Sequence, residues 1–191
     1  MTTEQFPRGK TAIVGAATFG LGIMPDWSSM ERATQASKRA LAEAGLRLSE
    51  VDALFVCTPD DFLAGLTFAE ALGLRPRFTD NNRTGGSAFM SHVITAAVML
   101  DAGMIDTALI AHGSNQRSGA GGKLVSAARS SNWEAPYTPL FPVSSYALAA
   151  ARHMHDFGTT REHLAEVAVA ARGWANQNPE AFATGPLSID D

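Results

Sequence analysis

The chain has 191 residues, of which 46% are apolar, and a formal net charge of −4. This composition predicts a globular protein with a buried core, and without a run of lysine and arginine the chain lacks the electrostatic footprint of a nucleic-acid-binding protein. No stretch approaches the roughly 20 apolar residues of a membrane span, the amino terminus lacks the apolar core of a signal peptide, and a single cysteine cannot form an internal disulfide, so we expect a cytoplasmic protein.

Apolar runs that are typical of strands alternate with helical stretches through the first part of the chain. We expect strands at residues 11–17, 53–57, 77–82 and 107–113. We expect helices from about Met30 to Ala44, where Ser28 and Glu31 form a capping box, at residues 62–72 and at residues 87–102. This alternation predicts right-handed crossovers and a mainly parallel sheet with helices on both faces. The fold class is therefore α/β.

The character of the sequence changes after the fourth expected strand. The stretch "SNQRSGAGGK" is glycine-rich and polar, and several prolines follow it before a helix at residues 146–157. Thr159 and Glu162 stand in capping-box register at the start of a further helix, and no strand comes after it. We therefore expect an α/β core at residues 1–113 and an incomplete helical excursion at residues 114–191.

The stretch "NNRTGGSAFMSHVITAAVML", residues 81–100, predicts a strand end, a tight turn at Gly85 and Gly86, and a helix. The free amides and positive dipole end of that helix are expected to face a cleft above the sheet edge, where they can hold an oxyanion or a thioester oxygen. A simpler interpretation is that the glycine pair only permits a tight turn and close packing. The helix is apolar on nearly every side, which predicts that a second sheet or another subunit covers it and that the protein dimerises.

This stretch resembles the nucleophile elbow of the thiolase superfamily. The likeness continues through "DAGMIDTALIAHG", and "SSYALAAARHMHDFGTTREHLAEVAVAARGWANQNPEAFATGPLSIDD" is similar to the loop domain of the same family. The chain is most similar to the sterol-carrier-protein-type, lipid-transfer-like thiolases, from Thr11 onward. The resemblance implies a thiolase-like amino-terminal half, with a mainly parallel sheet, followed by part of the loop domain.

In this resemblance the family's catalytic cysteine falls on Gly86, which implies altered or absent thiolase chemistry. Some relatives with glycine-rich elbows are steroid side-chain-degrading aldolases, which pair with a small OB-fold and zinc-ribbon partner and cleave a carbon–carbon bond without an acyl-enzyme. "GSNQRSGAGG" is similar to a segment of that subgroup. The resemblance implies that the main-chain N–H groups of Gly86 and Ser87 polarise a substrate carbonyl and that Asn82 contacts substrate. A nucleophilic Ser87 hydroxyl is the alternative, although we expect the helix start to use it as a cap.

Members of the family carry a second, topologically matching half that supplies the catalytic histidine. We therefore expect a thiolase-like acyltransferase or carbon–carbon lyase that handles acyl-CoA and is inactive as this chain alone. Either a homodimer or hetero-oligomer supplies the missing half, or the sequence is a fragment. The alternative is a non-catalytic thiolase-like subunit that binds CoA thioesters or serves as a scaffold. Coenzyme A enters as part of the substrate, and we expect no separate cofactor and no metal.

The remaining candidate residues are histidines and the single cysteine. His112 ends an expected strand on the ligand side of a parallel sheet, which makes it a candidate contact for a ligand or a partner subunit. His92 is expected to be a hydrogen-bonded core histidine, and Cys57 a small buried hydrophobe. His153 and His155 face different sides of a helix, which argues against a shared metal site. "GAATFGLG" lacks the spacing of a dinucleotide-binding loop, and nucleotide binding is kept as the alternative from a different functional class.

Overall fold

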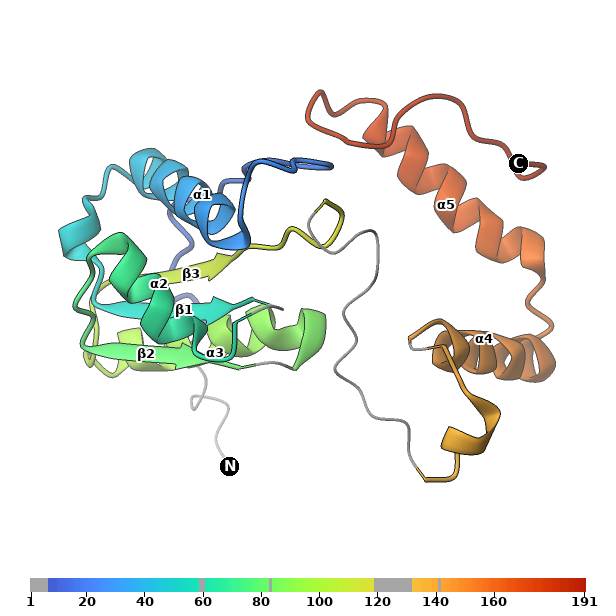
Figure 1. The fold of residues 1–191 in the computed structure, drawn as a ribbon, viewed down its shortest axis with the longest axis horizontal. Coiled ribbons are helices and arrows are strands. Elements are labelled where there is room, and N and C mark those ends of the chain that lie inside the picture. The colour runs from blue at the N-terminus through green and yellow to red at the C-terminus, as the bar shows by residue number, and fades with distance from the viewer. Residues whose placement is uncertain (1–6, 59–60, 83, 119–131, 141) are drawn as a thin grey trace. The chain divides into compact units, whose positions relative to one another are not determined.

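The computed structural model describes residues 7–58, 61–82, 84–118, 132–140 and 142–191. The chain divides into two compact units, Met1–Lys123 and Leu124–Asp191 (Figure 1). The domain boundary predicted after Gly113 stays a prediction. The part of "GSNQRSGAGG" beyond residue 118 lies outside the described residues.

The first unit contains a three-stranded parallel sheet. Its strands are β1 (Ala53–Cys57), β2 (Phe78–Asn81) and β3 (Ala108–His112), in the order β2-β1-β3. Cys57 at the end of β1 pairs in register with His112 at the end of β3. Because the strands are parallel, their carboxyl ends meet at one edge of the sheet. The predicted α/β class with a parallel sheet is confirmed.

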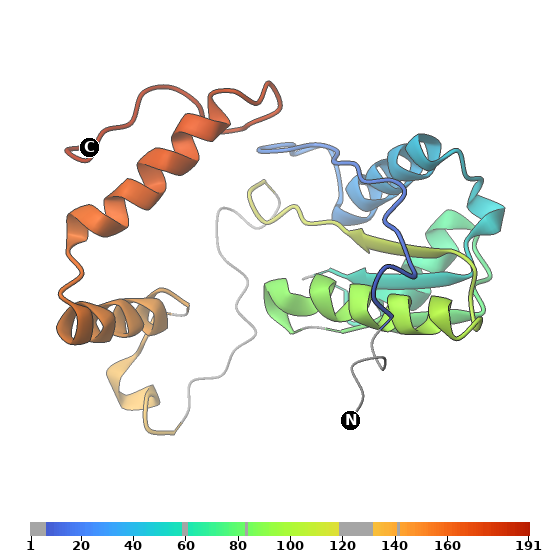
Figure 2. The same cartoon turned by 180° about the vertical axis from the view of Figure 1, so that it is seen from behind.

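Helices cover both faces of this sheet. Helices α1 (Ser29–Ala44) and α2 (Ala64–Leu72) pack on one face and α3 (Ala88–Asp101) on the other, as Figures 1 and 2 show from opposite sides. A short 3₁₀ turn, η1 (Leu48–Glu50), precedes β1. Leu54 and Val56 point into the core under α1 and α2, whereas Phe55 points into the core under α3. All three side chains are fully buried, which explains why the β1 sequence is apolar throughout.

Helix α1 begins with the predicted capping box. The Ser28 hydroxyl oxygen accepts a hydrogen bond from the Glu31 amide at 3.2 Å, and the Glu31 carboxylate accepts one from the Ser28 amide at 2.8 Å. The Ser28 amide, and then its hydroxyl, hold the pKa of Glu31 below its usual value. At the other end of the helix, Gly45 adopts a left-handed conformation (φ +69°) and ends it.

The strand predicted at residues 11–17 is wrong, because these residues form no strand in the structure. Ile13 is 78% exposed and Val14 is 62% exposed. The Ala16 amide donates a hydrogen bond to the Glu43 carboxylate of α1 at 2.7 Å and is therefore not available for a strand ladder. The apolar pattern indicates that these side chains favour burial, but no strand of the described chain pairs with this segment and buries it.

Helix α3 is buried on one face only within the described chain, and its cover by a second sheet or another subunit stays a prediction. Four of its residues are buried against the sheet: Ala88, His92, Ala96 and Met99. On the outward side, Met90 is 64% exposed, Ile94 50% and Val98 48%. One sheet can cover only one stripe of a helix. The exposed residues Met90, Ile94 and Val98 form a second apolar stripe along the helix, and this stripe needs a further surface to cover it.

Arg32 of α1 joins two loops beside the carboxyl end of β3. The side chain is only 6% exposed. Its Nη1 donates to the carbonyls of Gly20 (3.3 Å) and Ser114 (3.1 Å), and its Nη2 donates to the carbonyl of Met24 (2.8 Å) and the hydroxyl of Ser118 (3.1 Å). The guanidinium thus fixes the loop that leaves β3 against the loop that enters α1.

Replacing Arg32 with methionine is expected to lower the free energy of unfolding of the first unit by roughly 2–4 kcal/mol, because its oxygen partners lose a charged donor. Arg39→Met is the control, since Arg39 is exposed and the change should cost less than about 1 kcal/mol. Urea unfolding followed by Trp27 fluorescence, with Trp133 and Trp174 replaced by phenylalanine, measures both. Equal losses in the two variants would contradict the structural role of Arg32.

The second unit is built from helices without a core. Its elements are η3 (Ala135–Tyr137), α4 (Val143–Phe157) and α5 (Arg161–Ala175). No residue in the described part of this unit is buried. Large apolar side chains such as Tyr137, Val167 and Trp174 are at least 70% exposed. The helices of this unit therefore present apolar surface that the unit itself does not cover.

Both helices of the second unit begin at residues other than those predicted. Helix α4 begins at Val143 rather than Tyr146. Helix α5 is capped by Thr160, whose hydroxyl oxygen accepts from the His163 amide at 3.4 Å, and not by Thr159. Thr160 has the extended backbone of a cap residue, which moves the capping box one residue along the chain. None of the described helices in either unit is both long and apolar enough to cross a membrane.

Candidate functional site

The glycine elbow follows directly from the end of β2. Residues Gly85–Ser87 form a 3₁₀ turn, η2, and α3 continues from it at Ala88. Gly85 has a φ of +71°, a left-handed conformation that favours glycine. Gly86 lies outside that region, and a Cβ added to it would meet no atom within 4 Å. The turn therefore explains Gly85, whereas the backbone does not require glycine at Gly86.

The amides of this turn lie at the start of a continuous helical path. The Ala88 amide already donates to the Gly85 carbonyl. The Gly86 amide, two residues before it, comes too early in the turn to have a carbonyl partner within it. The Gly86 amide is therefore a donor at the positive end of this helical path.

The Ser87 hydroxyl does not cap α3, so the predicted cap is wrong. Its Oγ instead donates a hydrogen bond to the Thr84 carbonyl at 2.7 Å. Ser87 has helical rather than extended backbone, because η2 already precedes α3, and this geometry does not suit a capping side chain. The hydrogen bond of the Ser87 hydroxyl is therefore made within the elbow itself.

Asn82 holds the strand end against α3. Its Nδ2 lies 3.4 Å from both the Ser91 hydroxyl and the His92 Nδ1, and its Oδ1 accepts from the Thr84 hydroxyl at 3.1 Å. Both the Nδ2 and the Oδ1 of Asn82 therefore make polar contacts within the elbow and with α3. A contact of Asn82 with substrate stays a prediction.

His92 confirms the prediction of a core histidine. Its side chain is 0% exposed, with its ring centroid 5.4 Å from that of Phe55. The His92 Nδ1 also lies 3.6 Å from a carboxylate oxygen of Asp80. Its Nε2 is buried and has no hydrogen-bond partner among the described residues. His92 therefore belongs to the packing beneath the elbow and not to an open site.

His112 stands at the carboxyl end of β3 and is exposed. Its Nδ1 lies 2.7 Å from the Cys57 carbonyl oxygen at the end of β1. Its ring also makes an edge contact, with centroids 5.1 Å apart, with Phe89 in the first turn of α3. The structure therefore brings His112 next to the helix start that carries Gly86 and Ser87, and all three lie at the carboxyl edge of the sheet.

Cys57 is not at the tip of the elbow. It ends β1, the strand beside β2, and it is partly exposed rather than buried as expected. Among the described residues no group of three or more His, Cys, Asp and Glu side chains is placed to hold a metal ion.

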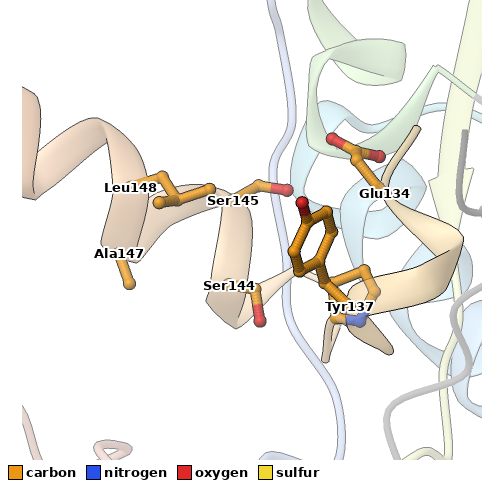
Figure 3. Close-up of a pocket in the computed structure, with 7 residues that line it drawn as sticks. Glu134, Tyr137, Ser144, Ser145, Ala147 and Leu148 are labelled. Atoms are coloured by element: carbon orange, nitrogen blue, oxygen red, sulfur yellow. The ribbon is translucent and has the colours of Figure 1, made fainter.

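A hollow of about 500 Å³ lies in the second unit, between η3 and the first turns of α4. Figure 3 shows Tyr137 and Glu134 from the turn facing Ser144, Ser145 and Leu148 from the helix. Its lining is mainly apolar. The sequence predicted only a turn-rich excursion here and did not predict this hollow.

Alanine at the two elbow glycines is expected to have opposite effects. Gly85→Ala should lower the free energy of unfolding by about 1–2 kcal/mol, since alanine is strained at a left-handed φ. Gly86→Ala should be neutral or stabilising by less than about 1 kcal/mol, because the site is open and alanine loses less backbone entropy on folding. Urea unfolding of the two matched variants tests this. A larger loss for Gly86→Ala than for Gly85→Ala would show that the turn requires glycine at position 86, contrary to the open space around it.

The parallel sheet, the glycine elbow and the apolar helix that follows it belong to a fold that is similar to solved thiolase-like structures. Its fold matches the solved structure of an Ltp2-ChsH2(DUF35) aldolase with a TM-score of 0.81 and 29% identity, over 94% of this chain and 47% of that one. A monomeric SCP2-thiolase-like protein from Mycobacterium smegmatis shares the fold, with a TM-score of 0.71 and 21% identity, over 93% of this chain and 37% of that one. The predicted resemblance to thiolase-superfamily proteins is confirmed.

Two curated relatives match nearly the whole chain. A steroid side-chain-cleaving aldolase from Thermomonospora curvata is 29% identical over 96% of this chain and 49% of its own length. A 17-hydroxy-3-oxo-4-pregnene-20-carboxyl-CoA lyase from Mycobacterium tuberculosis is 30% identical over 96% of this chain and 50% of its own length.

An acetyl-CoA acetyltransferase from Methanothermobacter thermautotrophicus is 31% identical over 89% of this chain and 46% of its own length. The chain thus spans about half the length of the curated relatives it matches. No protein-family model matches the chain.

Proposed function

We propose that this chain is the acyl-CoA-handling half of a thiolase-like enzyme that cleaves a carbon–carbon bond in a CoA thioester. The observation that supports this most is the elbow, where a helix start without a sulfur nucleophile stands beside an exposed histidine at the sheet edge. The names of the two relatives that match 96% of the chain, an aldolase and an acyl-CoA lyase, point to the same chemistry.

In this proposal the amides of Gly86 and Ser87 polarise the thioester carbonyl, and Gly86 replaces the family's cysteine. Asn82 and His112 contact the substrate from the strand ends. Preorganised amides stabilise the negative charge that develops on a thioester oxygen when an adjacent carbon–carbon bond breaks. An acyl-enzyme is not required, which agrees with a Ser87 hydroxyl that is already hydrogen-bonded to Thr84. Coenzyme A takes part as a portion of the substrate, without a separate cofactor.

A second half completes the site in this proposal, either as the rest of a longer polypeptide, as a second copy or as a different chain. The outward stripe of α3 and the uncovered helices of the second unit supply apolar surface for it. A further OB-fold and zinc-ribbon chain is the partner that the resemblance to steroid aldolases suggests, and the solved Ltp2-ChsH2 aldolase is a structure of that kind by name. The cytoplasm, where CoA thioesters are used, is the proposed location.

The test begins with the native assembly, which we define as the polypeptide that carries this sequence, isolated from its host with whatever it binds. Mass measurement of the native assembly identifies the completing half. We expect the assembly to cleave a 3-hydroxyacyl-CoA and the 191-residue chain alone to release no product from either that substrate or acetoacetyl-CoA. Turnover by the chain alone would contradict the proposal.

The competing function is a non-catalytic subunit that binds CoA thioesters or acts as a scaffold. The engaged Ser87 hydroxyl is compatible with both functions, because neither needs a nucleophilic side chain at the tip of the elbow. An assembly that binds acyl-CoA but cleaves none of the tested thioesters would support this second function.

A further inference from the structure

The hydrogen bond between His112 and Cys57 fixes which ring nitrogen of His112 carries the proton. A carbonyl oxygen can only accept, so at 2.7 Å the Nδ1 of His112 must be the donor. In the neutral ring, the lone pair then belongs to Nε2. The ring itself is held from a second side by Phe89. His112 is therefore a histidine of fixed tautomer and orientation.

The ring that carries this Nε2 lone pair lies beside the start of α3. Phe89 is in the first turn of α3, two residues after Ser87, so the imidazole lies against a side chain of the helix turn that follows the elbow. His112 is exposed at the sheet edge, whereas His92 is fully buried. The Ser87 hydroxyl already donates a hydrogen bond to the Thr84 carbonyl oxygen. Among the described residues discussed around the elbow, His112 combines an exposed ring with a lone pair on Nε2 in its neutral form.

We infer that His112 is the proton-transfer residue of the reaction, and this inference rests on the proposed function. Its substrate class is a thioester of coenzyme A with a hydroxyl on the carbon β to the thioester carbonyl. The Nε2 removes the hydroxyl proton, the bond between the α and β carbons breaks, and the β carbon becomes a carbonyl. The electron pair moves to the thioester as an enolate, whose oxygen accepts from the amides of Gly86 and Ser87.

The reaction is completed without an oxidant or a further reactant. His112, now protonated, returns the proton to the α carbon, which gives a shortened acyl-CoA and a ketone or aldehyde. The histidinium is stabilised by the Cys57 carbonyl, which accepts from Nδ1 throughout the cycle. The same atom therefore serves first as a base and then as an acid.

His112→Asn is the informative variant, since an asparagine amide can still donate to the Cys57 carbonyl but has no basic nitrogen. The probes are 17-hydroxy-3-oxo-4-pregnene-20-carboxyl-CoA and 3-hydroxybutyryl-CoA, assayed with the native assembly for cleavage and, in D₂O, for exchange of the α protons of the acyl-CoA product. Both rates should fall at least about 10²-fold in His112→Asn. Long-range ¹H–¹⁵N spectra of the wild-type chain should show the proton on Nδ1.

Three results would overturn the inference, and they can be told apart. Cleavage and exchange within tenfold of wild type in His112→Asn would remove His112 from the chemistry and leave the proposed function standing. A proton on Nε2 in the wild-type spectra would refute the tautomer on which the inference depends. A wild-type assembly that neither cleaves nor exchanges would overturn the proposed function and this role together.

Discussion

Replacing Gly86 with proline is expected to lower kcat of the native assembly by roughly 10²–10³-fold, the effect of losing one oxyanion donor. Proline removes the amide hydrogen and leaves the rest of the turn in place. The chain itself shows that a 3₁₀ turn accepts proline at its middle residue, because Pro136 occupies that position in η3 as Gly86 does in η2. Gly85 has no Cβ to clash with the new ring, which leaves only the contact between that ring and the Gly85 amide.

The control for this prediction is Gly86→Ala, which keeps the amide and should retain kcat within a few-fold. Steady-state rates with a 3-hydroxyacyl-CoA, together with the free energy of unfolding of each variant, separate lost chemistry from lost folding. A proline variant that is folded and still as active as the alanine variant would mean that the Gly86 amide does not contact the reacting oxygen.

Phe55→Ala is expected to cause the largest loss of stability, about 3–5 kcal/mol, because a fully buried ring leaves a cavity that the sheet cannot close. Phe55 lies in the middle strand and its ring contacts Phe78 of β2 and His92 of α3, with centroid distances of 5.5 and 5.4 Å. The cavity would therefore open between the sheet and the helix that carries the elbow. Activity of the native assembly should fall along with stability.

Phe62→Ala is the matched control for the same change of side chain, because Phe62 is 78% exposed. Its free energy of unfolding should change by no more than about 0.5 kcal/mol. Urea unfolding with Trp27 as the reporter measures both variants. A small loss for Phe55→Ala would show that α3 is not anchored through this ring.

Local patterns in the sequence predicted those elements whose stabilising contacts are also local. The capping box of Ser28 and Glu31 placed the start of α1, and the apolar run of β1 predicted a strand buried on both faces. Residues 11–17 have an equally apolar pattern, but burial depends on a neighbour that sequence does not reveal. In the structure the Ala16 amide bonds to α1 instead.

In the candidate site, too, the sequence predicted the features that depend on local contacts and not those that depend on long-range contacts. The tight turn at Gly85 follows from the glycine pair, and His112 was placed on the ligand side from its position at a strand end. The hydrogen bond from His112 to Cys57 joins residues 55 positions apart and depends on the register of β1 and β3. The hydroxyl contact of Ser87 with Thr84 depends on η2, whose 3₁₀ geometry the sequence did not reveal.

The most direct test of the central claim is the intact mass of this chain after the native assembly has turned over acyl-CoA and been quenched in acid. The account predicts an unmodified wild-type chain, because main-chain amides at the elbow polarise the thioester and no side chain takes the acyl group. Gly86→Cys, which has open space for its side chain, should gain the mass of one acyl group. An acyl adduct on the wild-type chain, at Ser87 or Cys57, would contradict the account.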